Sequence, residues 1–149
     1  MIKKRYKKLD YNTEDLESLS SSDLKKIADY SLRQYLLKHN GRDDGMYRCP
    51  LKKQWYQKDR IHVAHFHDRN RLNTRYNLDN CHLISEQSNV WESQVPYEGY
   101  KSRHHYEYEI WLREEIGEEK FEKLLQDSKQ LCIFTKSDYI ELINKFRNE

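Results

Sequence analysis

The chain contains 149 residues with a formal net charge of +2, and hydrophobic residues (36%) barely outnumber charged ones (35%). This composition predicts one small domain with a modest core, and no apolar run approaches the roughly 18 residues of a membrane helix, which excludes a membrane partner. No apolar stretch follows the basic N-terminus, so no secretory signal peptide is expected.

Cysteine usage indicates the compartment. Cys49, Cys81 and Cys132 are odd in number, lie far apart and form no CxxC pair. This pattern disfavours a disulfide scaffold and is typical of a reducing environment, so we expect a cytoplasmic protein.

The charge is unevenly distributed along the chain. Residues 47–76 carry eight Lys and Arg against two acidic residues, and the first eight residues carry five more basic ones, whereas the segment from Tyr106 onward has an acidic excess. This distribution indicates a polyanion bound against the middle of the chain. The alternative is that the basic runs are ordinary solvated surface.

One long helix is expected in the first third of the chain. Residues 1–12 are typical of a flexible basic arm, and the serines at 20–22 offer N-cap oxygens to a helix from Asp23 to His39. The following segment, 46–55, is mixed in character, and Pro50 limits any regular element there.

The middle of the chain predicts two strands and a helix. Alternation from Arg60 to His67 is typical of a strand, the polar segment 68–75 is typical of a loop, and residues 80–84 form a second short strand. A helix is expected to begin at Glu86 and run to about residue 92, with Ser85 as its N-cap.

The rest of the chain is predicted to be helical. Helices are expected at Tyr100–Ile116 and Glu118–Gln126, and Ser137 is expected to cap a last helix. His104 and His105 are expected at the surface.

Four of the seven histidines lie between His62 and Asn89. Hydrolysis of a phosphodiester needs a base, a divalent cation that neutralises charge on the phosphate, and a rigid scaffold that aligns the two. An imidazole suits the base because its pKa lies near neutrality. This stretch is therefore a candidate nuclease site.

The spacing within this stretch carries a resemblance. Ala64-His65-Phe66 is followed by Asn80-Cys81-His82-Leu83-Ile84 and by Asn89, with 15 residues from His65 to Asn80 and 9 from Asn80 to Asn89. The pattern resembles the HNH (His-Me finger) nuclease motif in its H-N-N form, and it is most similar to the phage NinG/Rap recombination endonucleases. The resemblance covers about residues 46–126.

The resemblance implies a role for each motif residue. His65 would be the general base, Asn80 would fix the loop between the strands, and Asn89 would bind the metal. The family usually has Asp or His before the base, where this chain has Ala64. We therefore expect His82 to replace that ligand, because residues 80 and 82 project from the same strand face. Other candidates for this ligand are His62, His67 and Asp68.

The metal expected at this site is Mg²⁺ or Mn²⁺, with Zn²⁺ or Ni²⁺ as alternatives. Many family members also hold a structural zinc with two CxxC pairs. The matching positions here read Met46-Tyr-Arg-Cys49 and Ser85-Glu-Gln-Ser88, so no structural zinc is expected.

The expected fold class is α+β. A small ββα-metal finger, with two short antiparallel strands and a helix, is embedded in a mainly helical domain. Segment 1–45 would be the basic arm and N-terminal helix, 46–99 the finger and 100–149 a C-terminal helical extension, all in one compact domain. The residues expected to contact DNA phosphates are Arg69, Arg71, Arg75, Lys52 and Lys53, with a solvated surface as the alternative.

The leading hypothesis is a metal-dependent DNA endonuclease of HNH type. The resemblance further implies branched recombination intermediates, such as Holliday junctions or D-loops, as substrates in phage DNA recombination, and a homodimer in the host cytoplasm. The alternatives are a catalytically degenerate nucleic-acid-binding module of the same fold, and an interaction protein whose acidic tail docks a host factor.

Overall fold

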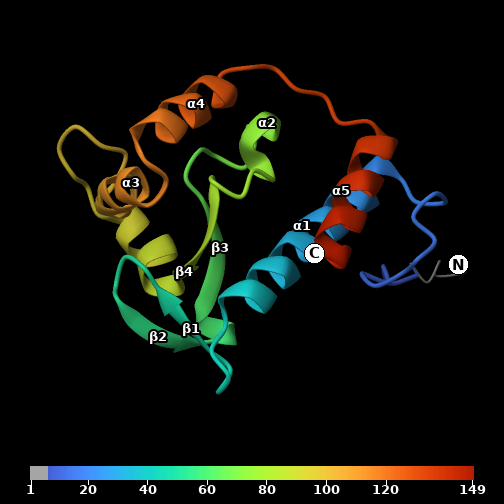
Figure 1. Ribbon diagram of the computed structural model, residues 1–149, viewed down its shortest axis with the longest axis horizontal. Helices are drawn as coiled ribbons and strands as arrows, with labels where there is room; N and C mark the ends of the chain where they lie inside the picture. The colour runs from blue at the N-terminus through green and yellow to red at the C-terminus, as the bar shows by residue number, and fades with distance from the viewer. Residues whose placement is uncertain (1–6) are drawn as a thin grey trace, which may run out of the picture. The chain divides into compact units, whose positions relative to one another are not determined.

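The computed structural model describes residues 7–149, so the first half of the expected basic arm lies outside the described residues. The fold is α+β, as expected: five α-helices accompany two separate two-stranded antiparallel sheets (Figure 1). The helices are α1 (Ser21–Asn40), α2 (Leu72–Arg75), α3 (Arg103–Ile116), α4 (Glu118–Ser128) and α5 (Lys136–Asn148).

The described residues divide into two compact units. One unit joins residues 7–35 with Phe134–Glu149, and the other comprises Leu36–Ile133. The expected finger and the first part of the expected helical extension therefore form one unit. None of the helices in the described part of the chain is long and apolar enough to cross a membrane.

The smaller unit contains α5 and the first part of α1. Arg147 of α5 donates hydrogen bonds to the carbonyl groups of Thr13 (2.8 Å) and Tyr11 (3.1 Å). The N-cap of α5 is Thr135, whose side chain accepts from the backbone N–H of Asp138, so the expectation of Ser137 as cap is wrong by two residues. A capping box needs an acidic or amide side chain three residues after the N-cap. Asp138 stands at that position for Thr135, whereas Ile140 would stand there for Ser137.

The larger unit begins with a hairpin that was not expected. Strand β1 (Met46–Cys49) pairs with β2 (Gln54–Gln57), and Cys49 lies opposite Gln54. Pro50 follows β1 directly and falls in the connecting turn, where its missing N–H removes no ladder hydrogen bond. Lys53 closes this turn with a φ of 56°.

The second strand pair carries the motif. Strand β3 (Ile61–His65) pairs with β4 (Cys81–Ser85) so that Ala64 lies opposite His82 and His65 opposite Cys81. The expected strand to residue 67 ends at His65. Phe66 still donates its backbone N–H to the carbonyl of Asn80, but both backbone groups of His67 bond to the Asn80 side chain instead of to a strand. The short helix α2 lies inside the segment expected to be a loop.

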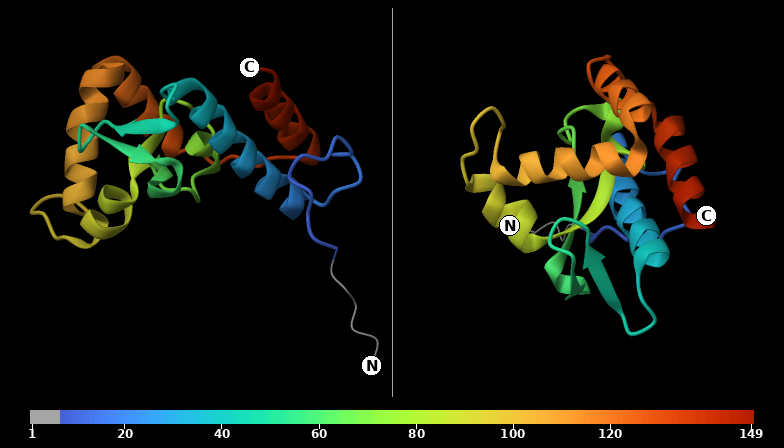
Figure 2. Two further views of the ribbon diagram at one scale, coloured as in Figure 1. Left: turned by 90° about the horizontal axis from the view of Figure 1, so that it is seen from below. Right: turned by 60° about the vertical axis from the view of Figure 1, so that its left-hand side comes forward.

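The helix expected after β4 is irregular. A π-helical turn, η2 (Gln87–Trp91), is followed by a 3-10 turn, η3 (Glu92–Gln94). Helix α3 crosses the β3–β4 pair in Figure 2, and α4 packs against α3 and α2. The core between these elements includes the buried side chains of Phe66, Tyr108 and Phe121.

Candidate active site

Asn80 holds together the segment that joins β3 to β4. Its side chain is fully buried, and its Oδ1 accepts a hydrogen bond of 2.7 Å from the backbone N–H of His67. Its Nδ2 donates to the carbonyl groups of His67 and Thr74, both at 3.1 Å. A single amide thus pairs backbone groups at two points of the connection, which is the geometry needed to fix the loop behind His65.

The imidazole of His65 is half-buried at the end of β3 and is oriented by a backbone carbonyl. Its Nε2 lies 2.9 Å from the carbonyl oxygen of Arg75. A carbonyl can only accept, so Nε2 must carry the proton and Nδ1 must be the nitrogen with the lone pair. The same carbonyl also accepts from the thiol of Cys81 at 3.0 Å. In the neutral imidazole this arrangement selects the tautomer that leaves the lone pair on Nδ1, which is the nitrogen that a general base would use.

His82 lies across from Ala64, the position where an acidic ligand is missing. Its Nδ1 is 2.6 Å from the hydroxyl of Tyr108, which in turn lies 3.4 Å from the carbonyl of Ala64. When Tyr108 donates to Ala64, His82 Nδ1 donates to Tyr108, and Nε2 keeps the lone pair that a metal needs. The ring of Trp111 contacts the His82 imidazole edge-on, with the centroids 4.9 Å apart.

Burial keeps His82 neutral. It lowers the pKa of His82 to about 4, with a smaller contribution from His65 nearby. The neutral imidazole is the form that binds metal, so His82 can act as a ligand throughout the physiological pH range.

Asn89 lies in η2 and is half-buried, but no hydrogen bond of its side chain to other residues between 7 and 149 links it to His65 or His82. In the same residues, no group of three or more His, Cys, Asp or Glu side chains is arranged to hold a metal ion. If His82 and Asn89 bound Mg²⁺ or Mn²⁺, water and substrate phosphate would have to supply the remaining ligands. One imidazole and one amide do not fit a tightly bound structural ion.

Ordinary packing contacts surround the positions that, by the motif resemblance, correspond to zinc-binding cysteines. Cys49 is fully buried in β1. The hydroxyl of Ser85 accepts from the backbone N–H of Ser88 at 3.3 Å, and the hydroxyl of Ser88 lies 2.9 Å from Nδ1 of His104. The expectation that His104 lies at the surface is wrong, because this bond holds its ring inside, and burial lowers its pKa to about 4.

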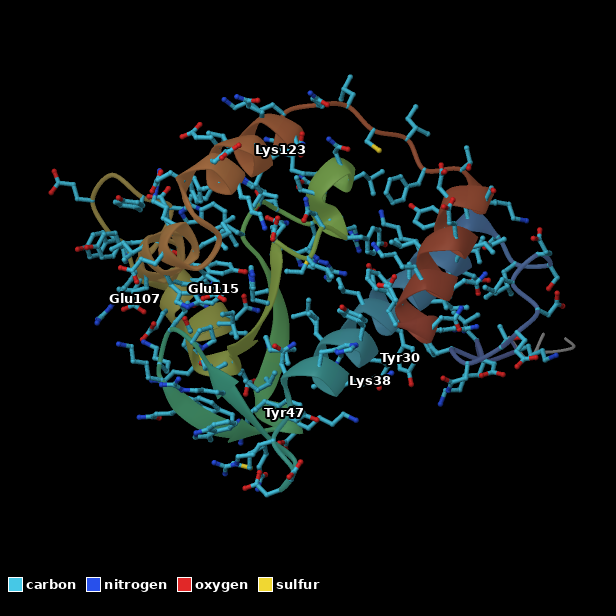
Figure 3. The ribbon with its side chains drawn as sticks, in the orientation of Figure 1. Tyr30, Lys38, Tyr47, Glu107, Glu115 and Lys123 are labelled. Carbon is cyan, nitrogen blue, oxygen red and sulfur yellow. The ribbon has the colours of Figure 1, made fainter. Side chains whose placement is uncertain are left out.

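Two of the five residues expected to contact phosphate are engaged elsewhere. Arg75 is buried, and its Nη1 donates to the carbonyl of Arg69 at 2.8 Å. Lys52 is paired with Glu92 and, at 3.5 Å, with Glu107 of α3, which Figure 3 labels. Because both cations already have partners inside the fold, their placement argues against a role in binding DNA.

The other three expected phosphate contacts are exposed. Arg69 and Arg71 lie in the connection between β3 and α2, and Lys53 lies in the β1–β2 turn. A side chain that sequence reasoning missed is Tyr108. Tyr108 lies four residues after His104 and four before Leu112, and all three are buried in α3. This spacing indicates a helix face in the core but gives no sign that Tyr108 hydrogen-bonds to His82.

Stability is expected to fall between pH 7 and pH 5. The folded pKa of His82 lies below its unfolded value, so the unfolded chain binds the extra proton in the window from about 6.5 down to about 4. The stabilisation is complete above that window and is lost as the pH falls, by about 2 kcal/mol at pH 5 from this group. Urea unfolding at the two pH values measures it, and equal free energies of unfolding would contradict this account.

Comparisons of the chain with family models, with curated proteins and with solved structures gave no match. His65 lies opposite Cys81 and His82 opposite Ala64, so the two imidazoles project from opposite faces of the β3–β4 pair. The case for a nuclease therefore depends on the motif spacing and on the hydrogen bonds that orient His65 and Asn80.

Proposed function

We propose that the protein is a metal-dependent DNA endonuclease of HNH type that hydrolyses phosphodiester bonds. The observation that supports it most is the hydrogen bond from His65 Nε2 to the Arg75 carbonyl. This bond leaves Nδ1 as the basic nitrogen. The side chain of Asn80 bonds to the backbone of His67 and Thr74 and so fixes the segment that follows His65. A base that is pre-oriented in this way loses little entropy in the reaction.

In the proposed reaction, His65 Nδ1 takes a proton from a water molecule whose oxygen attacks the phosphorus atom. The P–O bond to the leaving oxygen breaks, and that oxygen takes a proton from solvent. Exposed Arg69 and Arg71 hold neighbouring phosphates of the strand. His82 Nε2 and Asn89 would hold a divalent cation, which when bound neutralises charge on the scissile phosphate and the leaving oxygen. Tyr108 keeps the His82 ring oriented through its hydrogen bond to Nδ1.

The substrate part of the proposal comes from the resemblance to the NinG/Rap group. It names branched recombination intermediates, cut by a homodimer during phage DNA recombination in the host cytoplasm. The residues themselves support a narrower proposal: a phosphodiester bound near a base and exposed arginines, with no particular DNA structure specified.

A second candidate function is a nucleic-acid-binding module that has lost catalysis. The observation that favours it is the metal site. Ala64 supplies no ligand, and the described residues include no group of three acidic, histidine or cysteine side chains around His82. A finger that cannot hold a cation would still bind a polyanion through its basic loop.

Incubation of the purified protein with supercoiled plasmid and with a four-way junction separates the two candidates. Reactions contain Mg²⁺, Mn²⁺ or Ni²⁺, with EDTA as control, and DNA binding is measured in parallel at two salt concentrations. The endonuclease predicts nicking that EDTA abolishes. Salt-dependent binding without nicking in any metal would favour the binding module.

Replacing His82 with alanine is expected to raise the Mn²⁺ concentration needed for half-maximal nicking at least tenfold to a hundredfold, because loss of a residue that merely supports a metal ligand already costs roughly that much. The matched control is His39→Ala, which removes an exposed histidine at the end of α1. A metal titration of both variants measures the effect. If the two variants need the same Mn²⁺ concentration, His82 is not a ligand.

A further inference from the structure

A pocket of about 320 Å³ lies beside the chain that follows β3, and neither His65 nor His82 lines it. Its walls come from the segment that follows β3, from α3 and from α4, which lie close together in Figure 1. The buried rings of Phe66 and Phe121 contribute apolar surface to the pocket. The volume falls in the range of pockets that hold small ligands or parts of larger ones.

Two histidines of this pocket have ring nitrogens without partners. His67 Nε2 and His105 Nδ1 are buried, and neither has a hydrogen-bond partner in the part of the chain that the structure describes. Phe66 contacts both rings, with centroids 4.9 Å from His67 and 4.7 Å from His105. Buried polar atoms are nearly always paired, so these two indicate a missing partner.

The two imidazoles are neutral donors. Burial lowers the pKa of both, for His67 to about 4. A neutral imidazole carries one N–H to donate. Both residues line the pocket, so a ligand bound there is the partner that these unpaired nitrogens lack.

The charges around the pocket favour an anion. Lys101 is paired with Asp68 at 3.3 Å, and Arg113 lies 3.9 Å from Glu109. The two other positively charged residues that line the pocket are Arg71 and Lys129, and both are exposed.

Neither of these two cations has an acidic side chain within ion-pair distance among residues 7–149. Arg71 instead donates a long hydrogen bond of 3.5 Å to the carbonyl of Ser128. This excess of positive charge opposes a metal ion, although two imidazoles are present.

We propose that this pocket binds a phosphate group of DNA, with Arg71 and Lys129 as the charged contacts and His67 and His105 as neutral donors. A guanidinium, an ammonium and imidazole N–H groups are the donors that phosphate oxygens accept. The identification of the phosphate as part of DNA rests on the proposed function. His67 follows His65 by two residues, so a phosphate in the pocket would hold the strand beside the candidate base.

Binding is tested by calorimetric titration of the full chain with inorganic phosphate at constant ionic strength, in EDTA so that no cleavage occurs. Arg71→Ala and Lys129→Ala are each expected to weaken binding by on the order of tenfold, the effect of losing one charge-assisted hydrogen bond. The matched control is Lys123→Ala, which removes a cation from α4 that pairs with Asp127 and does not line the pocket (Figure 3).

A second variant keeps the charge unchanged. His105→Gln is expected to weaken phosphate binding several-fold while leaving thermal unfolding close to that of the unmodified chain. A short single-stranded oligonucleotide is expected to displace the phosphate.

Absence of phosphate binding, or equal binding by Arg71→Ala and Lys123→Ala, would overturn the proposal that the pocket binds phosphate. Phosphate binding without displacement by the oligonucleotide would overturn the assignment to DNA. Neither result depends on nicking, so a failure of the endonuclease proposal is seen separately.

Discussion

His65→Ala is expected to reduce the nicking rate by about 10²- to 10⁴-fold, the range that a general base contributes, while DNA affinity changes little. The reason is geometric. The imidazole accepts a proton through Nδ1 because the Arg75 carbonyl, 2.9 Å from Nε2, holds the proton on the other nitrogen. Alanine offers no acceptor, whereas the exposed arginines that we propose as phosphate contacts stay in place.

The measurement is single-turnover nicking of plasmid DNA, with DNA binding measured in EDTA. His39→Ala serves as the control, because it also removes one imidazole but lies at the end of α1. Both variants should unfold at similar temperatures. Unimpaired cleavage by His65→Ala would remove the assignment of the base, and a matching loss of DNA affinity would point to a role in binding.

Asn80→Ala is expected to lower the free energy of unfolding by about 3 kcal/mol or more, because it leaves buried groups without partners at about 1–3 kcal/mol each. The groups concerned are the backbone N–H and carbonyl of His67 and the carbonyl of Thr74. Asn80 is fully buried, so water cannot readily replace the lost amide.

Urea unfolding monitored by circular dichroism measures this loss. Asn77→Ala is the matched control: its Oδ1 accepts one hydrogen bond of 2.9 Å from the N–H of Asp79 in the same connection, and its loss should cost about 1 kcal/mol. If Asn80→Ala lowers the free energy of unfolding no more than Asn77→Ala does, the Asn80 side chain does not hold the loop between β3 and β4. Asn80→Asp should also destabilise, since it keeps the acceptor but loses both donated bonds.

Local patterns could predict the features that depend on near neighbours in sequence. Strand alternation located β3 and β4, helical periodicity located α1, α3, α4 and α5, and motif spacing singled out Asn80 before its hydrogen bonds were known. The fold class follows from the same signals. Errors of one to three residues arose at element ends, where a few local hydrogen bonds set the boundary, as in the capping box at Thr135.

Features that depend on distant partners could not be predicted. Lys52 reads as an exposed cation, yet its partners Glu92 and Glu107 lie 40 and 55 residues away. The β1–β2 hairpin was missed because Pro50 weighs against a strand in its surroundings and a four-residue strand has little periodicity. His104 lies in a polar-looking segment, and only the fold places Ser88 beside its ring.

The most direct measurement of the central claim is a crystal structure of the protein with a DNA duplex and Mn²⁺, recorded at a wavelength that reveals manganese by anomalous scattering. We predict a manganese peak within coordination distance of His82 Nε2 and a scissile phosphate within reach of His65 Nδ1 at the end of β3. Manganese bound elsewhere, or a phosphate out of reach of His65, would contradict a nuclease site on the β3–β4 pair.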